Sequence, residues 1–154
     1  MNIDKVIEIF SETRKESSLP RPIVEKLNLI EEYGIEFDKF ALKNLEQTVL
    51  LVGIDSYNLA LENDIKIEIG TLGENILVSF DPHRFDIGTK FQIGDDAIIE
   101  ITQICTVCNH LSVFDKKLPN LLKKKRGVYC KIVKSGLILK NMTIKSLFIK
   151  NNLK

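Results

Sequence analysis

Short runs in which hydrophobic and polar residues alternate dominate the chain from residue 65 onward. Alternation with a period of two is typical of strands that bury one face. Turn pairs such as Gly94-Asp95 and Ser135-Gly136 separate these runs. The pattern predicts strands at 66–70, 74–80, 90–94, 97–104, 127–133, 136–140 and 143–150. Many short strands at close spacing predict a mainly β fold, either a barrel or a sandwich.

The first part of the chain predicts fewer regular elements. A strand is expected at 5–10, followed by a polar surface loop that contains two prolines, and a fully buried strand at 48–53. A helix is expected at 54–62, with Asp55 as its N-cap. Residues 112–125 predict a loop with a helical turn on each side of Pro119. The basic run at 123–126 fits a solvated turn, with an anion site as the alternative.

Composition narrows the class of protein. Apolar residues are spread evenly along the 154 residues and no linker interrupts them, which predicts one domain over 1–154. The 22 basic and 21 acidic residues leave a formal net charge of +1, which disfavours binding to nucleic acid or to an anionic membrane. The charged N-terminus and the absence of a long apolar run predict a cytoplasmic protein.

The cysteines are the most reactive residues in the sequence. Cys105 and Cys108 form a Cys-x-x-Cys pair with three interpretations. The pair is half of a zinc site completed by His110 and Cys130, a thioredoxin-like redox pair, or one reactive thiolate beside a buried partner. Strand alternation places Cys105 and Cys130 on faces expected to be buried, whereas Cys108 follows the end of a strand.

Several segments resemble a known family in order and spacing. They are GTLGENILVSF with Gly73, Glu74 and Asn75, FQIGDDAIIEITQICTVCNHL with Gly94, Cys108 and Leu111, and RGVYCKIVKSGLI with Gly127, Tyr129 and Lys131. Upstream, GIEFDKFALK contributes Gly34, Ile35 and Asp38. Together they resemble the MOSC domain, the module named after the C-terminal part of molybdenum-cofactor sulfurases. The resemblance is strongest over 34–145 and indicates a stand-alone member.

This resemblance implies a mostly antiparallel β-barrel with a few short helices. It also implies that Cys108 carries sulfur as a persulfide or ligates the molybdenum of a pterin cofactor, in cofactor sulfuration or in the reduction of small N-hydroxylated compounds. Lys131, Arg126 and Lys43 are the candidates for lowering the pKa of this thiol and for binding the cofactor phosphate. Asp38 also belongs to the implied cofactor site. An electron-donor or sulfur-donor protein would be the partner.

Four residues of this implied site allow other roles or other functions. Glu74 and Asn75 are expected to stabilise their turn, with cofactor contact as the alternative. Phe37 stands where the family favours Gly, and Phe40 where many members have His. A non-catalytic binding or scaffold protein with the same fold is therefore one alternative function, and a small Cys/His zinc module is another.

Overall fold

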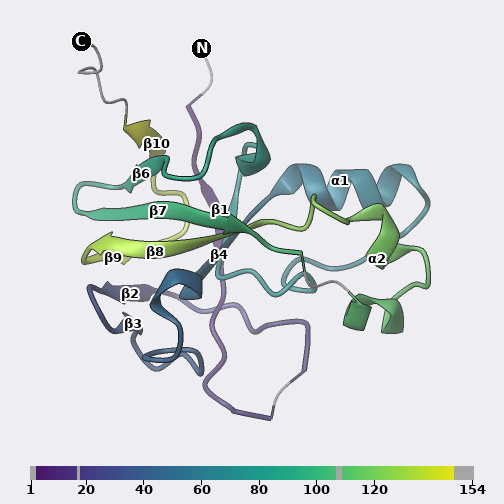
Figure 1. Cartoon of the computed structure of the whole chain (residues 1–154), viewed down its shortest axis with the longest axis horizontal. Coiled ribbons are helices and arrows are strands. Elements are labelled where there is room, and N and C mark those ends of the chain that lie inside the picture. The colour runs from purple at the N-terminus through teal and green to yellow at the C-terminus, as the bar shows by residue number, and fades with distance from the viewer. Residues whose placement is uncertain (1–2, 17, 107–108, 148–154) are drawn as a thin grey trace.

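The computed structural model describes residues 3–16, 18–106 and 109–147 (Figure 1). Two sheets form the framework of the molecule. The large sheet has the order β1-β5-β4-β8-β7-β6-β10 and the small sheet the order β3-β2-β9. The large sheet contains β1 (Val6–Ile9), β4 (Val49–Gly53), β5 (Ile76–Val78), β6 (Lys90–Ile93), β7 (Ala97–Ile104), β8 (Val128–Lys134) and β10 (Ile144–Leu147). The small sheet contains β2 (Leu27–Ile30), β3 (Gly34–Ile35) and β9 (Gly136–Ile138).

The helices are short and few, as the sequence predicts. They are α1 (Ile54–Glu62), α2 (Leu118–Leu121) and the 3-10 helices η1 (Leu45–Gln47), η2 (Pro82–Arg84) and η3 (Asn109–Val113). In Figure 1, α1 and α2 lie together at one end of the molecule, away from the small sheet. No helix among the residues described here is long and apolar enough to cross a membrane.

The expectation of a mainly β, mostly antiparallel barrel is only partly confirmed. The large sheet is curled into a half-barrel, and its edge strands β1 and β10 meet only near the bridge between Lys5 and Thr143. A closed barrel requires a continuous ladder between its edge strands. The sheet is also mixed, because the chain returns through α1 after β4 and β5 then pairs parallel to β4.

Local expectations are confirmed most closely where the apolar pattern is long. The observed strand β7 and helix α1 have the predicted bounds, and β4 is buried along its whole length. Four details are wrong. Residues 66–70 form no strand, β2 and β3 were not expected, Gly53 rather than Asp55 is the N-cap of α1, and Pro119 lies in the first turn of α2. Proline suits that position because the first turn of a helix needs no N–H from it.

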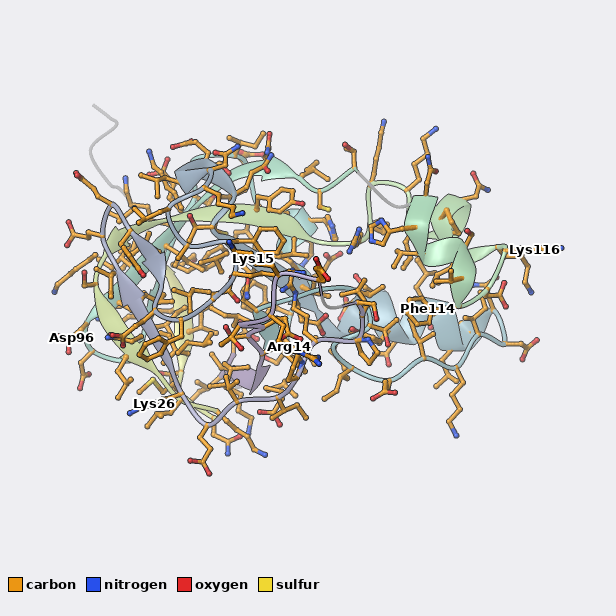
Figure 2. All side chains as sticks on the ribbon, turned by 90° about the horizontal axis from the view of Figure 1, so that it is seen from below. Arg14, Lys15, Lys26, Asp96, Phe114 and Lys116 are labelled. Atoms are coloured by element: carbon orange, nitrogen blue, oxygen red, sulfur yellow. The ribbon has the colours of Figure 1, made fainter. Side chains whose placement is uncertain are left out.

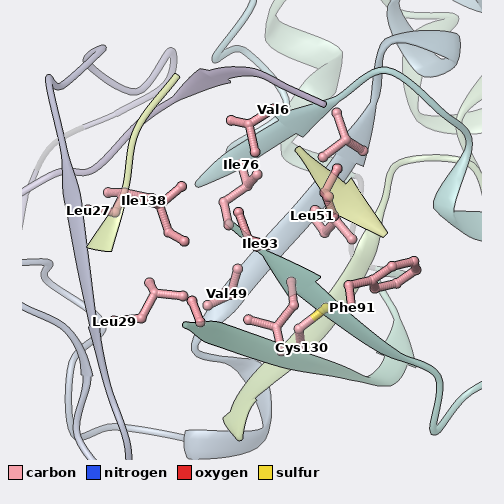
Figure 3. Packing of buried hydrophobic residues seen from close by; sticks show 14 of the residues in the cluster. Val6, Leu27, Leu29, Val49, Leu51, Ile76, Phe91, Ile93, Cys130 and Ile138 are labelled. Atoms are coloured by element: carbon pink, nitrogen blue, oxygen red, sulfur yellow. The ribbon is translucent and has the colours of Figure 1, made fainter. Parts of the chain in front are cut away.

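The core has two parts, which lie on the two faces of β4. Val49 and Leu51 pack into the first cluster, together with β1, β7, β8 and the small sheet (Figure 3). Leu50 and Val52 pack into the second cluster, together with α1 and the segment around α2. Cys130 belongs to the first cluster and Cys105 to the second, and both are fully buried. Their predicted burial is therefore confirmed.

Replacing Cys130 by Ser is expected to lower the free energy of unfolding by about 1–3 kcal/mol, because a hydroxyl would stand in an apolar site. Burial already raises the pKa of the Cys130 thiol and keeps it neutral. Urea denaturation of the Ser and Ala variants measures the effect, with Ala as the control for lost volume. A Ser variant as stable as the wild type would contradict this assignment.

Asn75 is expected to stabilise the protein through its side chain. Its Oδ1 accepts the N–H of Leu50 at 3.0 Å, and its Nδ2 donates to the carbonyl of Phe10 at 3.3 Å. Asn75→Ala should cost about 1–3 kcal/mol in urea denaturation, because both backbone groups would be left buried without a partner. Asn58→Ala, on the exposed face of α1, should change stability by less than about 0.5 kcal/mol. Equal effects of the two substitutions would contradict this role.

Candidate functional site

A cavity of about 700 Å³ opens between the loops beside β4 and β8. Its size falls within the range of small-molecule sites. Its walls come from five segments that are far apart in the sequence. The residues that line it are Ser18, Leu19, Arg21, Lys39, Phe40, Gln47, Thr48, Leu50, Gly73, Asn75, His110, Val113, Phe114, Arg126 and Tyr129. No carboxylate belongs to this set of described residues, so the cavity is cationic.

Two arginines converge on one turn at the wall of the cavity. The Nε of Arg21 donates to the carbonyl of Gly73 at 2.7 Å, and the Nε of Arg126 donates to the carbonyl of Leu72 at 2.8 Å. Gly73 adopts a φ of +85°, and a Cβ there would lie 3.0 Å from Nη2 of Arg126. Only glycine therefore suits the turn, for its backbone angle and for the approach of the guanidinium group.

Arg21 retains hydrogen-bonding capacity. Its Nη1 is buried and has no hydrogen-bond partner within the described part of the chain. Burial lowers the pKa of Arg21, the carboxylate of Asp38 opposes this shift, and the charge of Arg126 adds to it. A guanidinium group in a protein carries a positive charge at neutral pH. Two neighbouring cations of this kind favour an anionic ligand.

Aromatic side chains form much of the remaining wall. Phe40 lies with its ring centroid 5.0 Å from Cζ of Arg21 and 5.2 Å from Nζ of Lys39. Phe114 contributes from the end of η3, at the helical end of the molecule (Figure 2). Tyr129 contributes from β8, and its burial together with the neighbouring Cys105 raises its pKa to about 12. Flat rings and cations together suit a ligand with an aromatic part and an anionic part.

The structure brings some of the predicted site residues together. Arg126 and Asn75 line the cavity, and Glu74 is buried beside them in the same turn. Asp38 accepts hydrogen bonds from the Oγ of Ser11 at 2.7 Å and from the N–H of Phe40 at 3.1 Å. Asp38 is thus placed to fix the loop that carries Phe40.

Lys131 and Lys43 lie elsewhere. Lys131 occupies a separate hollow, where its Nζ is 4.0 Å from the carboxylates of both Glu46 and Glu100. Lys43 is exposed on the loop before η1 and does not line the cavity. Arg21 occupies the cavity instead, from the proline-flanked segment that the sequence predicted to be a surface loop. Its position between Pro20 and Pro22 was the only sequence feature that singled it out.

The two phenylalanines that depart from the family pattern have different positions. Phe37 has a φ of +70° and a side chain that is 73% exposed, outside the cavity. A positive φ at this position explains a preference for glycine, since the left-handed conformation costs other residues about 1–2 kcal/mol. Phe40 lines the cavity, so the aromatic side chain lies against Arg21.

Cys108 lies outside the described residues. Its described neighbours in the sequence do reach the cavity, since His110, Val113 and Phe114 all line it. Burial and the charge of Arg126 lower the pKa of His110, which favours its neutral form. The other two cysteines are buried in different core clusters. Within the ranges that the structure describes, no three His, Cys, Asp or Glu residues form a group able to hold a metal ion.

Comparisons with known proteins agree on the fold. The model of the MOSC domain family matches residues 38–145, which is more than two thirds of the chain. No curated protein matches the sequence significantly.

Solved structures resemble the whole chain. The YuaD protein of Bacillus subtilis superposes with a TM-score of 0.80 and 17% sequence identity, covering 94% of this chain and 96% of its own. YiiM from Escherichia coli gives a TM-score of 0.71 at 16% identity, covering 99% of this chain and 73% of its own. YiiM from Geobacillus stearothermophilus gives a TM-score of 0.72 at 14% identity, covering 97% of this chain and 77% of its own. At these identities the likeness concerns the fold, and the family match establishes that this chain belongs to the MOSC domain family.

Proposed function

We propose that the cationic cavity binds the pterin form of the molybdenum cofactor, and that Cys108 either ligates the metal or carries sulfur. The observation that carries the proposal is the pair of arginines at Gly73, of which Arg126 is buried and Arg21 partly buried, within an aromatic cavity that has no described carboxylate in its lining. A pterin cofactor combines a flat heteroaromatic ring with a phosphate. The cavity has a volume and a set of side chains that suit both parts.

Arg21 and Arg126 would hold the phosphate. Guanidinium groups form paired, charge-assisted hydrogen bonds with phosphate oxygens, and Nη1 of Arg21 is a buried donor without a partner among the described residues. Phe40, Phe114 and Tyr129 would enclose the ring. Bound there, the cofactor would supply two-electron redox chemistry for small N-hydroxylated compounds.

Cys108 would act as a thiolate in either role. A free thiol has an ordinary pKa near 8.5, so only a few per cent is ionised at pH 7. Nearby cations favour the thiolate, and Arg126 supplies a positive charge to the cavity that His110 lines, two residues from Cys108 in the sequence. Any electrons or sulfur would come from a partner protein in the cytoplasm.

A non-catalytic MOSC-fold binding protein is the second candidate function. Phe40 favours it, because an aromatic ring there replaces the polar side chain that many family members place at this position. Such a protein would keep the anion-binding cavity and would bind no molybdenum. Metal analysis distinguishes the two candidates.

Cys108→Ser is expected to lose at least nine tenths of the bound molybdenum or persulfide sulfur, because the oxygen of serine is a poorer ligand and cannot form a persulfide. The protein is reconstituted with molybdenum cofactor released from a molybdoenzyme, or loaded by a sulfur donor. Elemental analysis and cyanolysis then measure molybdenum and persulfide. Iodoacetamide at neutral pH should modify Cys108 before either buried cysteine.

Cys105→Ser is the matched control and should retain the loading. Retention of molybdenum and sulfur by the Cys108 variant would contradict the proposal. Faster alkylation of Cys130 would contradict the assignment of the reactive thiol.

A further inference from the structure

We propose that helix α1 positions the two arginines of the cavity through two positioning residues, Tyr57 on the helix and Glu74 in the turn at 70–74. This inference rests on the proposed anion-binding role of the cavity. Neither residue lines the cavity, so each would act only through the arginines.

The hydroxyl of Tyr57 connects α1 to the turn at 70–74. It lies 2.9 and 2.8 Å from the two carboxylate oxygens of Glu74. It also accepts the N–H groups of Gly70 at 3.0 Å and of Leu72 at 3.1 Å. Burial, and next the Glu74 carboxylate, raise the pKa of Tyr57, so the phenol stays protonated and donates to Glu74. One hydroxyl thus fixes three residues of the turn.

The same turn holds both arginines by its carbonyl groups. Leu72 accepts from the Nε of Arg126 and Gly73 from the Nε of Arg21. Gly70 accepts the backbone N–H of Arg21 at 3.0 Å, so Arg21 is held at its backbone and at its side chain. Movement of the turn would therefore displace both guanidinium groups.

A second contact from α1 fixes the residue that precedes Arg126. Ser56, adjacent to Tyr57, is buried, and its Oγ donates to the carbonyl of Lys125 at 2.5 Å. Two successive residues of α1 thus fix the chain before Arg126 and the turn that accepts its side chain.

Charge favours the same conclusion. Glu74 is fully buried, which raises its pKa, while hydrogen bonds from the backbone and Tyr57 and the charge of Arg126 act in the opposite direction. An apolar residue would fill this space without the cost of burying a carboxylate. As a carboxylate, Glu74 would offset the repulsion between the charges of Arg21 and Arg126.

The test is a titration of the full chain with inorganic phosphate. The NMR signals of the arginine Nε–H groups are recorded at each phosphate concentration. Arg21→Lys and Arg126→Lys variants assign the two signals. In the wild type both signals should shift with phosphate and exchange slowly with solvent. Tyr57→Phe should weaken phosphate binding about tenfold and accelerate both exchange rates, because the turn loses its connection to α1.

Two controls separate positioning from general loss of stability. Tyr33→Phe removes a phenol hydroxyl elsewhere, and Ile99→Val lowers the melting temperature through the first core cluster. Both should leave the dissociation constant of phosphate within twofold. If Tyr57→Phe fails to fold, Ser56→Ala decides: it should weaken binding and accelerate exchange at Arg126 but not at Arg21.

Unchanged phosphate binding and exchange rates in Tyr57→Phe, or in Ser56→Ala where that variant decides, would overturn the positioning role and leave the proposed function intact. Absence of any phosphate-induced shift in the wild type would instead contradict the anion-binding cavity, and the positioning role with it.

Discussion

The packing of two guanidinium groups, one buried and one partly buried, against one turn is the constraint on which the site depends. Buried charges require hydrogen-bond acceptors, and the carbonyls of Leu72 and Gly73 provide one for each arginine. The turn must therefore be rigid, and it must contain glycine where Arg126 approaches. Asn75 ties the end of this turn to β4, and Tyr57 ties its beginning to α1. The fold serves the cavity mainly by holding this turn in place.

The fold could be predicted well wherever burial alone decides the structure. The alternation along 97–104 and the apolar run before Gly53 are long enough to specify a strand. Residues 66–70 have a similar alternation, but the chain there ends in Gly70 at a φ of +93° and pairs with no strand in the described part of the protein. The closure of the sheet depends on how β1 meets β10, and no local pattern reports such a contact between distant segments.

The candidate site could be predicted only in part. Arg126, Glu74 and Asn75 stand in the motifs that carry the family resemblance; the structure places Arg126 and Asn75 in the lining of the cavity and buries Glu74 beside Asn75. Arg21 comes from an irregular loop, whose path a sequence pattern does not specify. Lys131 follows the buried Cys130 on β8, and it lies beside Glu100 of the adjacent strand instead of in the cavity. The hydrogen bonds of Tyr57 depend on a turn thirteen residues away.

The central claim is that this cavity holds an anionic pterin. Native mass spectrometry of the protein purified from its own host under anaerobic conditions tests it most directly. The account predicts a complex heavier than the chain by the mass of a phosphorylated pterin, which is lost when Arg21 and Arg126 are both replaced by Gln. A protein that carries only zinc, or that carries no ligand when the host makes the cofactor in excess, would contradict it.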